Sequence, residues 1–380
     1  MGGEGATPDF KPREALPSGA GGASSYKYTP VRVRPVNRRL PLALVLLLGL
    51  ALVVGLVIAS GIPLPALLNP SIPPNGYIPA PPGPNWTELQ PGLSPSSNDS
   101  MMTYVPSVGG LMLVTGSAGC GASSTWVFEG GVWVNLTRQV GPGPSPGRGN
   151  GGLVYDTADN YAVFFGGASG CGVFNDTWTF SNNTWSRIST PVAPPPLYSF
   201  SMTYDASDGY VLLTGGCCIA GADARATWAF HAGAWTNVTS GPGPVVDADS
   251  AMTYDAALGE VVFVGGYASG YVAQSTWTYH AGTWVRLFPA ISPSNRAGLG
   301  LAYDTALGRD VLVGGYTKVT TGVYVNLTDT WQYENGKWQN LTATLDGTPP
   351  FVTSPTLVAY DPPRDALVLF AGPGETWEFK

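Results

Sequence analysis

The sequence predicts an all-β fold of six four-stranded sheets, preceded by a single membrane-spanning helix. A Tyr-Asp pair recurs at intervals of about fifty residues, a length that suits one four-stranded repeat unit. Each copy continues with an apolar run that ends in small residues and then with Thr-Trp-X-aromatic. Near the N-terminus, residues 40–62 contain no charged side chain.

Each copy of the repeat can be divided into four strands, named a to d. Strand a ends in Tyr-Asp (Tyr-Val in the first copy), and the aspartate caps the next turn. Strand b is the apolar run, whose Gly-Gly lets the backbone leave a crowded centre. Strand c carries Thr-Trp-X-aromatic with both rings on one face, and strand d carries a second Trp. The tyrosines that mark the six copies are Tyr104, Tyr155, Tyr204, Tyr254, Tyr303 and Tyr360.

The two ends of the repeat region complement each other. The last copy stops at Lys380 after strand c, whereas residues 85–91 (NWTELQP) match an isolated strand d. Pairing these two segments would complete a sixth sheet and remove two exposed sheet edges. Because one such sheet cannot bury both faces alone, the units stack around an axis. The sequence therefore predicts a six-bladed β-propeller over residues 85–380, closed by an N-terminal strand.

The repeat resembles the kelch repeat, in which Gly-Gly follows strand b and spaced aromatic residues end in a Trp. The matching glycine pairs lie at 166–167, 215–216, 265–266 and 314–315. The resemblance implies a fold like the central domain of galactose oxidase. It also implies a binding platform, as in most kelch propellers, or copper chemistry, as in a minority.

The copper site of such oxidases is not expected in this chain. It requires histidines that converge on the axis, and the chain has only His231 and His280. Both occupy the same c–d turn in consecutive copies, so we interpret them as turn residues.

Residues 40–62 are long enough to cross a bilayer as one helix. Lys and Arg are absent from the end of this segment to Arg138, whereas four arginines lie just before it: Arg32, Arg34, Arg38 and Arg39. The positive-inside rule then predicts a single-pass protein of the cell membrane with a cytoplasmic N-terminus and an extracellular C-terminus.

The segments that flank the apolar stretch carry no periodic pattern. Residues 1–39 are rich in Gly, Pro and Ser and are expected to be a disordered cytoplasmic tail. Residues 63–84 contain nine prolines and are expected to form an extended stalk. The alternative is a cleaved signal peptide, for which residues 59–61 (Ala-Ser-Gly) offer small side chains near a cut.

Charge excludes nucleic acid as a partner. Residues 1–39 hold seven Lys or Arg and three Asp or Glu, and the rest of the chain holds eleven against twenty-two, a net charge of −11. A domain of this sign lacks the basic surface that phosphate binding requires.

Eight sequons for N-glycosylation follow the apolar segment, which agrees with an external location of this part of the chain. Their asparagines are Asn85, Asn98, Asn135, Asn175, Asn182, Asn237, Asn326 and Asn340.

The four cysteines are disulfide candidates, since an even count fits an oxidising compartment. Cys120 and Cys171 fall in the b–c loops of adjacent copies, and a bond between them would join blades one and two. Cys217 and Cys218 fall in the third b–c loop, where they form a vicinal bond or one of them pairs with Cys171.

Sequence motifs for catalysis are absent: there is no nucleophile elbow, metalloprotease helix motif or P-loop. Asp247 and Asp249 form only an isolated Asp-X-Asp, a weak calcium pattern, so no cofactor and no metal are expected.

The b–c and d–a loops emerge together on one face and contain the least repetitive segments, so this loop face is where we expect a ligand. The candidate residues are Tyr316, Lys318, Tyr324, Arg225 and Arg148. The leading hypothesis is a surface-displayed binding or adhesion module for a protein or glycan. The alternatives are an enzyme acting on surface polysaccharide and a purely structural component of the cell envelope.

Overall fold

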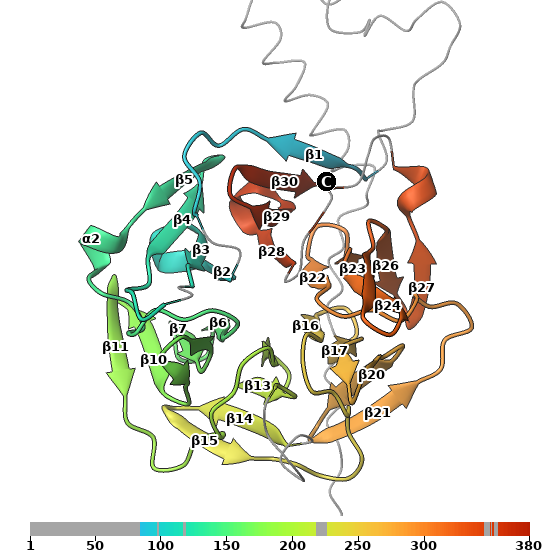
Figure 1. Ribbon diagram of the computed structural model, residues 1–380, viewed down its shortest axis with the longest axis horizontal. Coiled ribbons are helices and arrows are strands. Elements are labelled where there is room, and N and C mark those ends of the chain that lie inside the picture. The colour runs from blue at the N-terminus through green and yellow to red at the C-terminus, as the bar shows by residue number, and fades with distance from the viewer. Residues whose placement is uncertain are drawn as a thin grey trace, which may run out of the picture. The chain divides into compact units, whose positions relative to one another are not determined.

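The computed structural model describes residues 84–380 except 97–98, 117–118, 218–225, 346–349, 351 and 353–355. The described residues form six four-stranded antiparallel sheets arranged as the blades of a propeller (Figure 1). The predicted tail (1–39), membrane helix (40–62) and stalk (63–84, apart from Pro84) lie outside the described residues. The all-β six-bladed propeller of four-stranded blades is confirmed.

In each blade the sheet order is a–b–c–d, with strand a innermost in the ring (Figure 1). Blade 1 contains β2 (Met101–Val105), β3 (Gly110–Val114), β4 (Thr125–Glu129) and β5 (Val132–Asn135). Blade 2 contains β6 (Gly152–Asp156), β7 (Tyr161–Phe165), β10 (Thr177–Ser181) and β11 (Thr184–Ile188). Blade 3 contains β12 (Ser201–Asp205), β13 (Tyr210–Thr214), β14 (Thr227–His231) and β15 (Ala234–Asn237).

Blade 4 contains β16 (Ala251–Asp255), β17 (Glu260–Val264), β20 (Thr276–His280) and β21 (Thr283–Leu287). Blade 5 contains β22 (Gly300–Asp304), β23 (Arg309–Val313), β26 (Thr330–Glu334) and β27 (Lys337–Asn340). Blade 6 contains β28 (Leu357–Asp361), β29 (Ala366–Gly372), β30 (Glu375–Phe379) and β1 (Trp86–Leu89). The short helical turns are η2 (Pro106–Val108), α2 (Thr137–Val140), η4 (Thr342–Thr344) and η5 (Pro362–Arg364).

Among the described residues, three b–c loops carry an additional two-stranded hairpin. They are β8 (Ala168–Ser169) with β9 (Gly172–Val173) in blade 2, β18 (Tyr267–Ala268) with β19 (Tyr271–Val272) in blade 4, and β24 (Tyr316–Thr320) with β25 (Val323–Asn326) in blade 5.

The ring closes as the sequence predicts, through the first and last strands. β1 pairs with β30 as strand d of blade 6, with Trp86 opposite Phe379 and Leu89 opposite Thr376. The Asn85 N–H donates to the Lys380 carbonyl at 2.7 Å, next to this pair. The chain therefore begins and ends its propeller in the same sheet.

A hydrogen bond between neighbouring blades recurs at every blade junction. The strand-d Trp of each blade donates its Nε1–H to the Oγ1 of the Thr that begins strand c of the preceding blade, at 2.9 to 3.0 Å, and each bond is buried. The six pairs are Trp86–Thr330, Trp133–Thr376, Trp185–Thr125, Trp235–Thr177, Trp284–Thr227 and Trp338–Thr276. The Thr of Thr-Trp is thus the acceptor for the next blade.

The same Trp also packs on the aromatic residue of its own strand c, with ring centroids 4.9 to 5.1 Å apart in all six blades. The apolar cores lie between blades rather than inside one blade. One of them, for example, combines Val163 and Phe165 of blade 2 with Leu213 and Trp235 of blade 3. Each sheet therefore depends on its neighbours for burial.

The Gly-Gly pairs are required by backbone geometry at the end of strand b. In blades 2 to 5 both glycines have positive φ, as at Gly265 (69°) and Gly266 (105°). A Cβ built at Gly265 would lie 2.4 Å from the Arg296 carbonyl oxygen, and one at Gly314 would lie 2.1 Å from Val352. Glycine alone combines this conformation with so close an approach of the next d–a segment.

The aspartate of Tyr-Asp caps the a–b turn, as predicted. In blades 2 to 4 its Oδ1 accepts the backbone N–H groups two and three residues later, at 2.8 to 3.2 Å. These aspartates are buried at the inner end of the turn, and burial raises the pKa of the Asp156, Asp205 and Asp255 carboxyls.

Deleting residues 85–91 from the full-length chain removes strand d of blade 6 and one of the six inter-blade bonds. We expect a marked fall in melting temperature, because the β30 edge and the core around Phe379 become exposed to water. Deletion of residues 5–11, which is of equal length, is the control. A melting temperature equal to that of the parent would contradict the closure.

Replacing Thr177 with Val keeps the shape of the side chain and removes the acceptor of the buried Trp235 Nε1–H. We expect a loss of about 1–3 kcal/mol in the free energy of unfolding, because a buried donor is left without a partner. Urea titration measures the change. Thr179→Val on the same strand is the matched control, and equal effects of the two substitutions would refute the role of the bond.

Candidate functional site

The axis of the propeller is hollow where strands a begin. A cavity of about 190 Å³ opens there, on the face from which the d–a loops emerge. Its lining comes from all six blades and includes Ser100, Asn150, Ser199, Asp249, Gly298 and Thr356. We call this opening the axial mouth.

The backbone of the axial mouth forms a chain of hydrogen bonds that passes from blade to blade. Ser199 donates to the Asn150 carbonyl (2.7 Å), Asp249 to Ser199 (2.9 Å), Gly298 to Asp249 (2.7 Å) and Thr356 to Gly298 (3.2 Å). The residue two positions before strand a has positive φ in blades 2 to 5, between 55° and 63°. These bonds fix the positions from which the Asn150, Ser199 and Asp249 side chains line the cavity.

Tyr316 connects the axial mouth to the b–c hairpin of blade 5. Its hydroxyl donates to Asp249 Oδ2 at 2.8 Å. Burial, together with the neighbouring Asp249 carboxylate, raises the pKa of Tyr316 well above its usual range, so it remains a hydrogen-bond donor at physiological pH. The ring of Tyr316 meets that of Tyr324 edge to face, with centroids 5.5 Å apart.

Four tyrosines on two neighbouring hairpins form the tyrosine cluster, defined as Tyr267, Tyr271, Tyr316 and Tyr324. Strand β19 contacts β24, so the hairpins of blades 4 and 5 lie side by side. The nearby Tyr324 hydroxyl is the main cause of a raised pKa of Tyr267. Tyr271 and Tyr324 are 57% and 46% exposed, so their rings are accessible to a ligand.

Lys318 lies beside the tyrosine cluster on β24. Its ammonium group donates to the Gly270 carbonyl in the neighbouring hairpin at 2.7 Å. The structure thus brings together three of the residues that the sequence singled out, Tyr316, Lys318 and Tyr324. It adds Asp249, which the sequence offered only as part of a weak calcium pattern, and Tyr267 and Tyr271. For Tyr267 the sequence signal is that it directly follows Gly-Gly, as Tyr316 does in the next copy.

Of the two remaining candidates, Arg148 does not contribute to this surface. Arg148 is fully buried: it is paired with Asp176 and stacks over the Phe174 ring at 3.9 Å, so its guanidinium cannot reach a ligand on the loop face. Arg148 lies beneath the b–c hairpin of blade 2 and helps to hold that hairpin in place. Arg225 lies outside the described residues.

Metal binding finds no support in the parts of the chain that are described. There, no three His, Cys, Asp or Glu side chains come together in a way that could hold an ion. The two aspartates of the Asp-X-Asp are engaged elsewhere, Asp249 with Tyr316 and Asp247 with the Ser269 N–H. His231 and His280 end strands β14 and β20 at the c–d turns, where the sequence predicts them.

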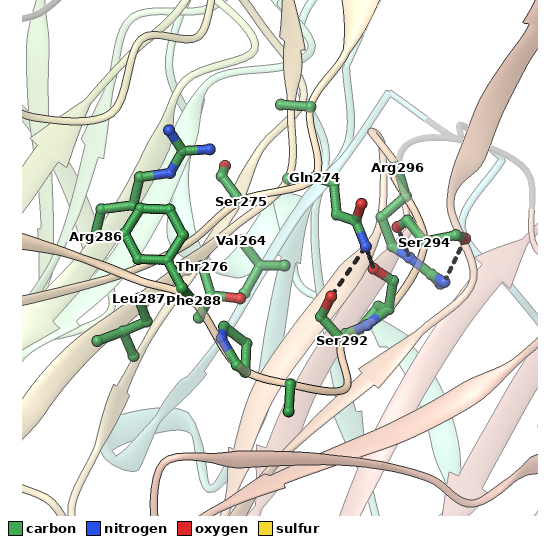
Figure 2. Close-up of a pocket in the computed structure, with 15 residues that line it drawn as sticks. Val264, Gln274, Ser275, Thr276, Arg286, Leu287, Phe288, Ser292, Ser294 and Arg296 are labelled. Atoms are coloured by element: carbon green, nitrogen blue, oxygen red, sulfur yellow. Dashed lines mark hydrogen bonds between the residues drawn. The ribbon is translucent and has the colours of Figure 1, made fainter.

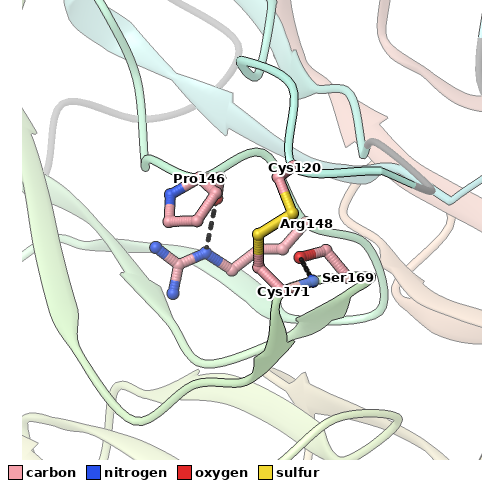
Figure 3. Close-up of a disulfide and its surroundings, with 5 residues drawn as sticks. All are labelled: Cys120, Pro146, Arg148, Ser169 and Cys171. Carbon is pink, nitrogen blue, oxygen red and sulfur yellow. Dashed lines mark hydrogen bonds between the residues drawn. A yellow bond between two sulfur atoms is a disulfide. The ribbon is translucent and has the colours of Figure 1, made fainter.

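Cys120 and Cys171 form a disulfide between the b–c loops of blades 1 and 2, with Cα atoms 5.5 Å apart (Figure 3). The bond lies on the loop face close to Arg148, whose Nε–H donates to the Pro146 carbonyl (Figure 3). Cys217 has a backbone bridge to Tyr198 in the d–a segment, and Cys218 lies outside the described residues.

Three of the sequons have a structural role in the repeat. At the end of strand d, the Asn side chain accepts the N–H of the Thr two residues later, at 2.9 to 3.0 Å. The hydroxyl of that Thr in turn accepts the N–H that begins strand c, at 2.9 to 3.0 Å. The asparagines are Asn135, Asn237 and Asn340. The repeat itself therefore uses Asn-X-Thr in alternate blades, which accounts for three of the eight sequons.

Of the other sequon asparagines, Asn175 lies in a loop, Asn182 lies in a turn and Asn326 ends β25. Asn175, Asn182 and Asn326 are exposed, Asn85 is half-buried next to Trp86, and Asn98 lies outside the described residues. Among the described helices, none has the length and apolar character needed to cross a bilayer.

The structure is therefore a closed six-bladed β-propeller, and its axial mouth and its tyrosine cluster lie on the loop face. Its fold is similar to the solved structure of YjhT, with a TM-score of 0.58, 16% sequence identity, and coverage of 76% of this chain and 95% of that one. This likeness concerns the fold alone. The sequence matches no protein-family model and no curated protein.

Proposed function

We propose that this chain is a kelch-type propeller, anchored in the cell membrane by residues 40–62, which binds a glycan on its extracellular loop face. The observation that carries the proposal is the tyrosine cluster at the axial mouth. Binding modules of repeat architecture place recognition in variable loops on a rigid scaffold. Of the three b–c hairpins that the structure describes, those of blades 4 and 5 begin with a tyrosine.

The chemistry of the cluster favours a glycan over a protein. Tyrosine gives a rigid ring with an apolar face and a polar edge, and it loses little conformational entropy on binding. The hydrogen bond from Tyr316 to Asp249 and the edge-to-face contact of Tyr316 with Tyr324 hold these rings before any ligand arrives. Sugar rings present C–H faces and hydroxyl groups together, which match aromatic faces bordered by a carboxylate and an ammonium group.

The compartment follows from independent features. The arginines before residue 40 and the absence of Lys and Arg until Arg138 support a cytoplasmic N-terminus. The exposed disulfide between Cys120 and Cys171 and the exposed sequon asparagines support an oxidising, extracellular location for the propeller.

Binding is tested with the full-length chain on a glycan array, followed by titration of the best ligand. We expect Tyr324→Ala and Tyr271→Ala each to weaken binding at least about tenfold, because each removes an exposed ring. Tyr324→Phe keeps the ring and is the matched control for stacking. Unchanged affinity in both alanine variants would place the site elsewhere, and capture of a protein but of no glycan would favour the protein alternative.

Topology is tested on intact cells with a membrane-impermeant lysine reagent. We expect labelling of the exposed Lys337 and Lys380 and protection of Lys11 and Lys27 until the membrane is permeabilised, because the reagent reaches only the external side. Mass spectrometry identifies the labelled residues. The reverse pattern, or labelling of all four lysines in intact cells, would refute the proposed orientation.

A further inference from the structure

A second cavity lies in blade 4 and shares no lining residue with the tyrosine cluster. Its volume is about 370 Å³, and Figure 2 shows Arg286 and Phe288 on one side and Gln274 and Ser292 on the other. Arg286 and Phe288 come from β21 and the segment that follows it, and Ser275 directly precedes β20. The Phe288 side chain is 81% exposed.

Blade 2 has an arginine at the position equivalent to Arg286, and there the chain itself places a carboxylate next to it. There Arg187 faces Trp178 across the c–d pair, as Arg286 faces Trp277 in blade 4. In blade 2 the residue before Thr-Trp is Asp176, and its carboxylate lies 3.4 Å from the Arg187 Nε. In blade 4 the same position holds Ser275. In blade 2 this carboxylate also accepts hydrogen bonds from the buried Arg148, and in blade 4 Arg286 has no ion pair among the described residues.

Arg286 has an uncompensated charge as a result. No carboxylate among the described residues forms an ion pair with it, and its guanidinium instead lies over the rings of Trp277 and Phe288, at 5.9 and 5.1 Å from their centroids. Stacking leaves the edge of the guanidinium, with its N–H donors, open to the cavity. A guanidinium that stacks on aromatic rings and has no ion pair binds a carboxylate through paired hydrogen bonds.

We propose that this cavity binds the carboxylate of an acidic sugar. The carboxylate takes the place that Asp176 occupies in blade 2, facing Arg286 and the Ser275 side chain. The exposed Phe288 ring offers an apolar face for the C–H groups of the sugar ring, and the Gln274 amide borders the opposite side.

The net charge limits the ligand further. Residues 40–380 hold eleven Lys or Arg and twenty-two Asp or Glu, so the domain repels a polyanion at long range. One arginine in such a field suits a ligand with a single carboxylate. This inference does not depend on the glycan site proposed for the tyrosine cluster.

The test is a calorimetric titration of the full-length chain with glucuronate, glucose and acetate. The parent is expected to bind glucuronate. It is expected to bind glucose and acetate at least about tenfold more weakly, because glucose lacks the carboxylate and acetate lacks the sugar ring. Arg286→Gln is expected to weaken glucuronate binding at least about tenfold. Arg187→Gln, at the equivalent position that Asp176 already fills, is the matched control and is expected to bind as the parent does.

Ser275→Asp supplies the sharpest variant because it keeps Arg286 and adds the internal carboxylate of blade 2. It is expected to abolish glucuronate binding, because the added carboxylate takes the place beside Arg286 that the ligand would occupy. The proposal is overturned if the parent does not bind glucuronate, if glucose or acetate binds as tightly, or if Arg286→Gln or Ser275→Asp binds like the parent while folded.

Discussion

The hydrogen bond from the strand-d Trp to the first Thr of strand c in the preceding blade is the interaction on which this structure depends. It occurs at all six junctions, is buried at each, and links every blade to the one before it until the circle is complete. Since the apolar cores also lie between blades, no blade has a core of its own. The stability of this fold therefore depends on the closure of the ring.

Most of the fold could be predicted from sequence because its constraints are local and repeated. Tyr-Asp, Gly-Gly and Thr-Trp each correspond to one step of a blade, and the unpaired strand d at 85–91 indicates how the ring closes. The role of Thr as an acceptor for the neighbouring blade was missed. Its partner lies about sixty residues away, and a repeat pattern alone does not state which copies touch.

The candidate site could be predicted only in part. Tyr316, Lys318 and Tyr324 lie together because they share one hairpin, and proximity in sequence is enough to find them. Asp249 joins them from another blade through the curvature of the ring, which the sequence does not encode in any local pattern. Arg148 looked available because it lies in a glycine-rich loop, yet its pairing with Asp176 is a contact across the blade and buries it.

The pairing of β1 with β30 also determines how the domain is presented. Asn85 and Lys380 are bonded to each other where the other blades have a c–d turn. The polypeptide consequently enters and leaves the propeller at the end of the blades opposite the axial mouth. A molecule that approaches the tyrosines and the hairpins therefore meets the end of the blades opposite the Asn85–Lys380 hydrogen bond.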